Sequence, residues 1–93
     1  MSTLRTYWES GHADAEQPLR AWYCIADAAI WKNFADVKRD FPSADLVGGD
    51  RLVFNIGGNN YRLVCLVRFG KPNLFVLWIG THAEYDSIDV RNL

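Results

Sequence analysis

The sequence predicts an α+β fold in which N-terminal helices pack on one face of a three- to four-stranded antiparallel sheet. As far as residue 41, apolar residues recur at steps of three and four, the spacing of amphipathic helices. After Pro42 the spacing changes to two, as in strands that have two different faces. With 49% hydrophobic residues, the 93-residue chain is expected to form one domain over residues 1–93.

Two longer helices are expected in the first part of the chain. Leu4 and Trp8 lie one helical turn apart, which predicts a helix over residues 3–10. Asp14 is a suitable N-cap for a second helix that ends near residues 31–32. The inward face of this second helix is expected to consist of Leu19, Trp22, Tyr23, Ala26, Ala29 and Ile30.

A third, shorter helix is expected over residues 34–40, because Pro42 cannot continue it. His12, which lies between the first two helices, is expected to be a solvated loop residue. Turn-forming segments rich in glycine and asparagine divide the remaining chain into strands. The strands are expected at residues 44–47, 51–56, 61–69 and 74–79, with turns at 57–60 and 70–73.

The two turns fix an expected register for the sheet. If each turn has four residues, the pairs are Ile56 with Tyr61, Asn55 with Arg62, Phe69 with Leu74, and Arg62 with Thr81. The face against the helices is then expected to hold Leu52, Phe54, Ile56, Leu63, Cys65, Val67, Phe69, Leu74, Val76 and Trp78. Arg62 and Arg68 should emerge from the opposite face, roughly 20 Å apart along one strand.

The segment Gly80–Asp86, with the sequence GTHAEYD, is the strongest candidate for chemistry. Thr81 is expected to cap a short helical turn that places His82 and Tyr85 on one side. The expected register brings Arg62 next to this turn. Together these groups supply a base, an acid and a cation, which are the requirements for cleaving RNA through its own 2′-hydroxyl.

Charge and motifs exclude several other functions. The net charge of −1 argues against a protein that binds nucleic acid by bulk charge, although residues 1–50 carry −3 and residues 51–93 carry +2. Cys24 and Cys65 are expected to be buried thiols, and no spacing suits a zinc site. The sequence has no nucleotide-binding glycine loop, so no cofactor or metal is expected. It also has no signal peptide or membrane span, which predicts a cytoplasmic protein.

Four segments resemble the HigB-type toxins of bacterial type II toxin–antitoxin systems, which belong to the RelE-like superfamily. These segments are EQPLRAWY (16–23), WKNFADVK (31–38), SADLVGGDRLVFNIGGNNYRLV (43–64) and GTHAEYDSID (80–89). The resemblance implies a single HigB-like domain with a RelE-like fold. It also implies an mRNA interferase, an endoribonuclease that typically cuts messages on the translating ribosome, and a HigA-type helix-turn-helix antitoxin as partner.

The same resemblance implies a catalytic set of Arg62, His82 and Tyr85. We further expect RNA to be positioned by Asn55, Asn60, Arg68 and Lys71. Two alternatives from other functional classes remain at this point. One is a non-enzymatic toxin on the RelE scaffold, such as a gyrase inhibitor, and the other is an inactive module that only binds an antitoxin. The sequence does not give the codon preference or say whether His82 or Tyr85 is the acid.

Overall fold

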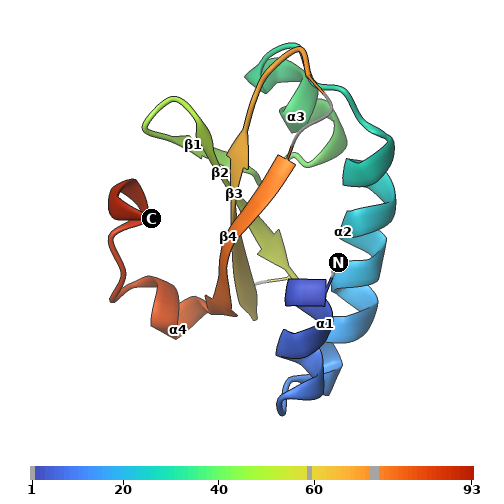
Figure 1. The fold of residues 1–93 in the computed structure, drawn as a ribbon, viewed down its shortest axis with the longest axis vertical. Helices are drawn as coiled ribbons and strands as arrows, with labels where there is room; N and C mark the ends of the chain where they lie inside the picture. Colours follow the sequence, from blue (N-terminus) through green and yellow to red (C-terminus); the bar gives the residue numbers. More distant parts are fainter. Residues whose placement is uncertain (1, 59, 72–73) are drawn as a thin grey trace.

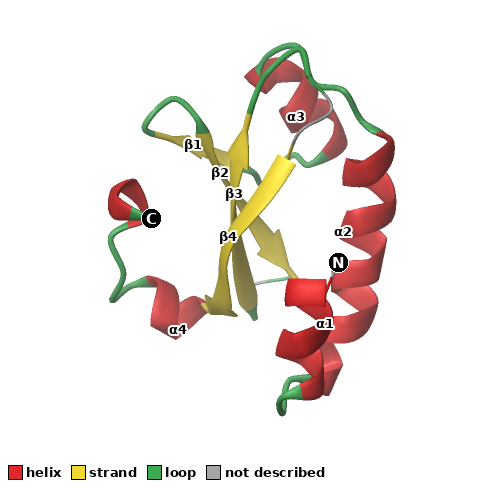
Figure 2. Cartoon of the chain, viewed as in Figure 1, coloured by secondary structure: helices red, strands yellow, loops and turns green. Residues whose placement is uncertain are grey.

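A four-stranded antiparallel sheet stands between the N-terminal helices and the C-terminal segment (Figures 1 and 2), which confirms the predicted α+β class. The computed structural model describes residues 2–58, 60–71 and 74–93. The strand order is β1-β2-β3-β4, so β1 and β4 form the two edges. The elements are α1 (Ser2–Glu9), the 3-10 turn η1 (Ala13–Ala15), α2 (Glu16–Ala28), α3 (Phe34–Asp40), β1 (Asp45–Val47), β2 (Arg51–Ile56), β3 (Tyr61–Val67), β4 (Leu74–Thr81), α4 (His82–Tyr85) and the 3-10 turn η2 (Val90–Asn92).

Helix α2 ends earlier than the sequence predicts, because the chain leaves the helix to bury Trp31. Ala29 is already extended, with φ −93° and ψ 143°. The Trp31 ring then enters the core, where only 5% of the residue is exposed, and its Nε1–H donates to Asp40 Oδ2 at 2.9 Å. Ile30 is 58% exposed, so the prediction that it faces inward is wrong. The predicted N-cap, Asp14, lies in η1, and Ala15 occupies the cap position of α2.

Aromatic rings join the helices to the sheet. Phe54 on β2 meets Trp22 of α2 with ring centroids 5.4 Å apart, and meets Phe41 at 5.0 Å in edge-to-face geometry. Burial of one such large side chain contributes roughly 1.5–3 kcal/mol to folding. The helix-facing core is therefore strong enough to fix β2 and β3 relative to α2. Its buried members are Leu4, Trp8, Ala15, Leu19, Trp22, Ala26, Trp31, Val37, Ala44, Leu52, Phe54, Ile56, Tyr61, Leu63, Cys65 and Val67.

The predicted register is confirmed between β2 and β3 and is wrong between β3 and β4. Asn55 pairs with Arg62, and Ile56 with Tyr61, as expected. Leu74, however, pairs with Val67 instead of Phe69, so the connection between these strands runs from residue 68 to residue 73. Of the predicted turn at 70–73, residues 72 and 73 lie outside the described residues.

A β-bulge in β4 causes the second departure from the predicted register. Val64 pairs with Trp78, whereas the next residue, Cys65, pairs with Val76, so Leu77 is an extra residue on β4. A bulge reverses the alternation of side chains beyond it. Leu77 and Trp78 therefore both pack on the face away from the helices, and Ile79 packs toward them. The prediction that Trp78 faces the helices is wrong. Arg62 pairs with Gly80, and the predicted pair with Thr81 is also wrong.

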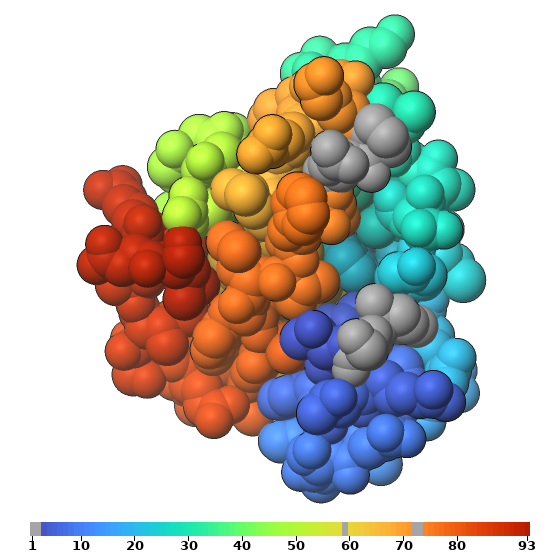
Figure 3. All heavy atoms as spheres, in the orientation of Figure 1, coloured from blue at the N-terminus to red at the C-terminus, as the bar shows by residue number. Residues whose placement is uncertain are grey.

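The C-terminal segment covers part of the second face of the sheet. Val90 of η2 packs on Val53 and Val64, and Arg51 Nη2 donates to the carbonyl oxygen of Leu93 at 2.5 Å. In Figure 3, β4 lies on the surface between α1 and this C-terminal segment. Phe75 of β4 stays 49% exposed. The second face is therefore covered over β2 and β3, and is open along β4.

The two cysteines lie in different environments. Cys65 is buried, and burial raises the pKa of its thiol above the ordinary value. Cys24 on α2 is exposed, so the prediction of two buried thiols is wrong for this residue. The reason is its position on α2, between the inward-facing residues Trp22 and Ala26 and on the outer side of the helix. Over the described ranges, no helix is both long enough and apolar enough to span a membrane.

Candidate active site

Helix α4 is fixed to the end of the sheet by hydrogen bonds at its N-terminus. Thr81 caps the helix as predicted: its Oγ1 accepts from the Glu84 N–H at 3.1 Å, and Glu84 Oε1 accepts from the Thr81 N–H at 2.8 Å. These bonds, led by the one from the Thr81 backbone, lower the pKa of the Glu84 carboxyl. The His82 N–H also donates to the Asn60 carbonyl oxygen at 3.1 Å. The first residue of α4 is thus held against the β2–β3 turn.

Arg62, His82 and Tyr85 come together at this end of the sheet. Arg62 Nη2 lies 2.8 Å from His82 Nε2. The guanidinium carbon of Arg62 lies 4.7 Å from the centroid of the Tyr85 ring, so the cation stacks on the phenol. Each of the three side chains is partly buried. A guanidinium, an imidazole and a phenol thus share one small, solvent-accessible site on the face away from the helices.

The contact between Arg62 and His82 defines the protonation of the imidazole in this arrangement. An arginine side chain has only donors and stays charged, so its N–H must donate to His82 Nε2. Nε2 must then carry a lone pair, and the ring proton of a neutral imidazole lies on Nδ1. His82 is therefore held in a form that can accept a proton at Nε2.

Asn55 lies beside Arg62 on the neighbouring strand, as the sequence predicts. Its Oδ1 is buried and has no hydrogen-bond partner within the described residues, and the same is true of Arg62 Nε. One of these atoms is an acceptor and the other carries a donor hydrogen, and unpaired buried groups of this kind are unfavourable. Asn55 is thus placed to hold the guanidinium of Arg62 when that side chain moves.

The other predicted RNA-binding residues are not in this cluster. Arg68 and Lys71 are exposed in the segment after β3, at the end of the strand opposite to Arg62. Arg68 is six positions from Arg62, a separation of roughly 20 Å along a strand. Asn60 is exposed at the near end and contributes its backbone carbonyl to His82. The structure thus brings Arg62, His82, Tyr85 and Asn55 together and leaves Arg68 and Lys71 apart.

A second group of ionisable side chains lies on the helix side of the same sheet end. His12 stacks on Tyr7 with ring centroids 4.1 Å apart and is half-buried, so the prediction of a solvated loop residue is wrong. The Tyr61 hydroxyl donates to Asp14 Oδ1, and this hydrogen bond raises the pKa of Tyr61 to about 12. Burial, then the charges of Glu84 and Asp14, raise the pKa of Tyr7. The sequence carries no local signal for this group, because its members come from three separate segments.

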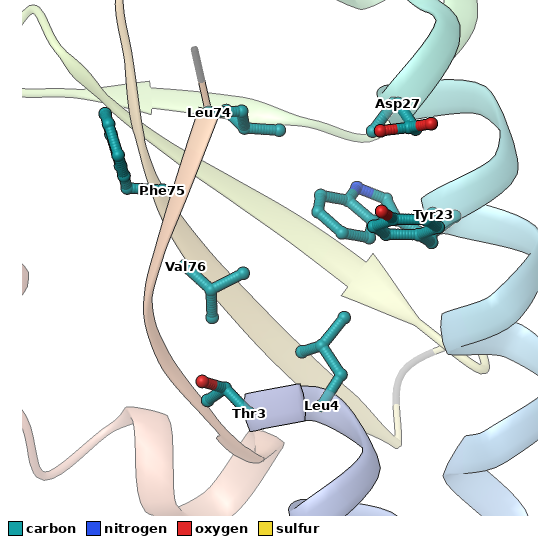
Figure 4. Close-up of a pocket in the computed structure, with 9 residues that line it drawn as sticks. Thr3, Leu4, Tyr23, Asp27, Leu74, Phe75 and Val76 are labelled. Carbon is teal, nitrogen blue, oxygen red and sulfur yellow. The ribbon is translucent and has the colours of Figure 1, made fainter. Parts of the chain in front are cut away.

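The structure also contains a pocket of about 280 Å³ between α1, α2 and β4 (Figure 4). Leu74 and Val76 point into it, and Phe75 points to the other side of the strand. None of the residues of the Arg62 cluster lines it; the lining is Thr3, Leu4, Trp22, Tyr23, Ala26, Asp27, Leu74, Phe75 and Val76. Where the chain is described, no group of three or more His, Cys, Asp and Glu side chains is arranged to hold a metal ion.

Comparison with known proteins relates this chain to a family of toxins. The profile of the HigB toxin family, described as the RelE-like toxic component of a toxin–antitoxin system, matches residues 15–88. The mRNA interferase HigB of Escherichia coli O6:H1 is 28% identical over 72 residues, which are 75% of this chain and 70% of that protein. The mRNA interferase toxin HigB of Escherichia coli strain K12 is 36% identical over 58 residues, or 60% of this chain and 56% of that protein. The chain belongs to the HigB family of RelE-like toxins.

Proposed function

We propose that this protein is the toxin of a toxin–antitoxin pair and an endoribonuclease that cleaves messenger RNA, with Arg62, His82 and Tyr85 as its reacting groups. The observation that carries the proposal is the contact of Arg62 with both partners, at 2.8 Å from His82 Nε2 and 4.7 Å from the Tyr85 ring centroid. The relatives named mRNA interferase HigB support the same activity.

The reaction is an attack of the ribose 2′-oxygen on the adjacent phosphorus. The 2′-hydroxyl loses its proton to one protein group, and the 5′-oxygen of the next nucleotide leaves with a proton from another. The products are a 2′,3′-cyclic phosphate, which water can open to a 3′-phosphate, and a 5′-hydroxyl end. His82 and Tyr85 share the two proton transfers. Arg62 stabilises the negative charge that builds on the phosphate oxygens.

Binding of the phosphate can itself activate His82. In the unbound protein, the acceptor Nε2 of His82 is occupied by the Arg62 N–H. A phosphate is a stronger, bidentate acceptor for a guanidinium than an imidazole is, so Arg62 turns toward the scissile phosphate. This movement frees Nε2 to take a proton. Asn55 Oδ1, which is unpaired among the described residues, accepts from Arg62 Nε and holds the turned side chain.

Arg68 and Lys71 contact the message away from the cleaved bond. Both are exposed, and their distance from Arg62 along β3 suits successive phosphates of an extended strand. With a net charge of −1, the protein binds free RNA weakly, so the translating ribosome presents the message. The antitoxin is of the HigA helix-turn-helix type, and both proteins act in the cytoplasm.

Induced expression in bacteria, with mapping of message ends, tests this function. The wild type should stop growth and produce new message ends with 5′-hydroxyl groups, and a His82→Ala, Tyr85→Phe double variant should not. The Arg5→Ala variant is a control, because Arg5 is an exposed residue of α1 whose loss changes the charge as Arg62→Ala does. Growth arrest with gyrase-dependent DNA breaks and intact messages would contradict the proposal. So would normal growth with intact messages while the antitoxin still binds.

A further inference from the structure

Trp78 lies beside the candidate active site because of the bulge in β4. Without the extra residue Leu77, the alternation of side chains would direct Trp78 toward the helices. Instead Trp78 packs with the second cluster of apolar residues, which includes Tyr85. The bulge thus places a large aromatic ring on the same face of the sheet as Arg62.

The Trp78 ring occupies the space where a side chain of Gly80 would lie. A Cβ atom at Gly80 would be 2.5 Å from both Cζ2 and Cη2 of Trp78, which is closer than carbon atoms can approach. Gly80 is the strand partner of Arg62. A residue with any side chain at position 80 would therefore displace the indole, and the two residues form a pair of complementary size.

Trp78 supports Tyr85 on the side away from the helices. Their ring centroids are 6.2 Å apart, with 56° between the ring planes. Tyr85 in turn carries the guanidinium of Arg62 at 4.7 Å, and Arg62 contacts His82 at 2.8 Å. Helix α4 has only four residues, too few to be a stable helix alone. The direction of the Tyr85 ring must therefore be fixed by packing.

We propose that Trp78 is a positioning residue that is seated over Gly80 and holds the Tyr85 phenol in its catalytic place. The inference rests on the proposed function, since it assigns Trp78 an effect on the same reaction through Tyr85. Trp78 itself makes no contact with Arg62 or His82 within the described residues, so its effect passes through Tyr85.

Single-turnover cleavage of a ribosome-bound message measures the effect on the reaction. Trp78→Leu should lower the rate constant about ten- to a hundredfold, because a shift of about 1 Å in a catalytic group has an effect of this order. The enzyme concentration at half-maximal rate should change by less than about threefold, since ground-state binding of the message is kept. In the Tyr85→Phe background, Trp78→Leu should have almost no further effect.

Gly80→Ala provides an independent test from the other side of the pair. Alone, it should slow cleavage as Trp78→Leu does, because it displaces the indole. In the Trp78→Leu background the added methyl group has room, so Gly80→Ala should change the rate by less than about twofold. Phe75→Leu is the matched control, because Phe75 is an exposed aromatic residue on the same strand, and it should leave the rate unchanged.

Fluorine NMR of the protein labelled with 3-fluorotyrosine tests the inference without any activity. The chain has four tyrosines, and Tyr85→Phe identifies the Tyr85 signal. Trp78→Leu and Gly80→Ala should both shift this signal and leave the signals of Tyr7, Tyr23 and Tyr61 in place, which also shows that the variants fold. If Trp78→Leu does not fold, Trp78→Phe, which keeps a smaller ring, should give the same shift.

Two results would overturn the inference. The first is a Tyr85 signal that does not move in the folded Trp78 and Gly80 variants. The second is a loss of rate from Trp78→Leu that is as large in the Tyr85→Phe background as in the wild type. If the wild type cleaves no message, the proposed function fails, and the fluorine spectra still decide whether Trp78 positions Tyr85.

Discussion

Replacement of Arg62 is the most informative perturbation of the candidate site. The guanidinium bonds to His82 Nε2 through one nitrogen and stacks on the Tyr85 ring with its flat face. Alanine removes both contacts together with the charge. Lysine keeps the charge, but a compact ammonium cannot stack on Tyr85 and present a two-pronged donor to a phosphate at the same time. The two variants therefore separate the contribution of charge from that of geometry.

The magnitude follows from the contacts that are lost. Loss of one preorganised contact to the charge of a transition state costs on the order of 3 kcal/mol, or about a hundredfold in rate. The stacking on Tyr85 adds about 0.5–2 kcal/mol to the placement of these two groups. We expect Arg62→Ala to be slower by about a hundredfold or more, and Arg62→Lys by roughly tenfold. Because Arg62 is only partly buried and forms no ion pair among the described residues, the free energy of unfolding should change by less than about 1 kcal/mol.

Single-turnover cleavage on ribosomes gives the rates, and urea unfolding gives the stabilities. Arg5→Ala controls for the change in net charge and should cleave at the wild-type rate, because Arg5 is an exposed residue of α1. If Arg62→Ala cleaves within about threefold of the wild-type rate, Arg62 does not stabilise the transition state. If Arg62→Ala is slow only because it unfolds, the assignment loses its support as well.

The remaining predictions address the other groups of the site and its surroundings. His82→Ala and Tyr85→Phe should each slow single-turnover cleavage about a hundred- to ten-thousandfold, the range for positioned acids and bases. Arg68→Ala should raise the protein concentration at half-maximal rate and leave the single-turnover rate constant unchanged, because Arg68 lies far from the cluster. Tyr61→Phe should lower the free energy of unfolding by about 1–3 kcal/mol at pH 8, since it removes a hydrogen bond to the Asp14 carboxylate. The pKa of Tyr61 is raised from 10.0 to about 12 in the folded protein, so this stabilisation is complete below pH 10 and is lost as the pH rises through 12. Urea unfolding of both proteins at several pH values should show the difference shrinking over that interval; a constant difference would mean that the hydrogen bond to Asp14 does not stabilise the fold.

Local signals in the sequence were sufficient for the features that depend on near neighbours. The bounds of α3 and β2 match the predicted residues, and Thr81 caps α4 as its side chain predicts. The pair Asn55–Arg62 follows from the short connection between β2 and β3, since a tight turn fixes the register of the strands that it joins. These local features were enough to bring Arg62, His82 and Tyr85 to one end of the sheet.

Features that depend on distant parts of the chain were not predictable in this way. The bulge at Leu77 reverses the alternation along β4, and no residue type at that position signals it. The place of Trp78 was therefore missed, and so was the reason for a glycine at position 80. The stacking of His12 on Tyr7 depends on the approach of α1 and η1 to β3. Sequence spacing alone cannot give such contacts.

The central claim is that the message supplies its own nucleophile, and a chemically modified message tests this most directly. A single 2′-deoxy nucleotide is placed on the 5′ side of the cleaved bond in a message bound to the ribosome. We predict that this message stays intact at wild-type enzyme concentrations that cleave the unmodified message, and that the unmodified message yields a 5′-hydroxyl end. Cleavage of the deoxy-substituted message at the same bond, or a 5′-phosphate end on the product, would contradict the account.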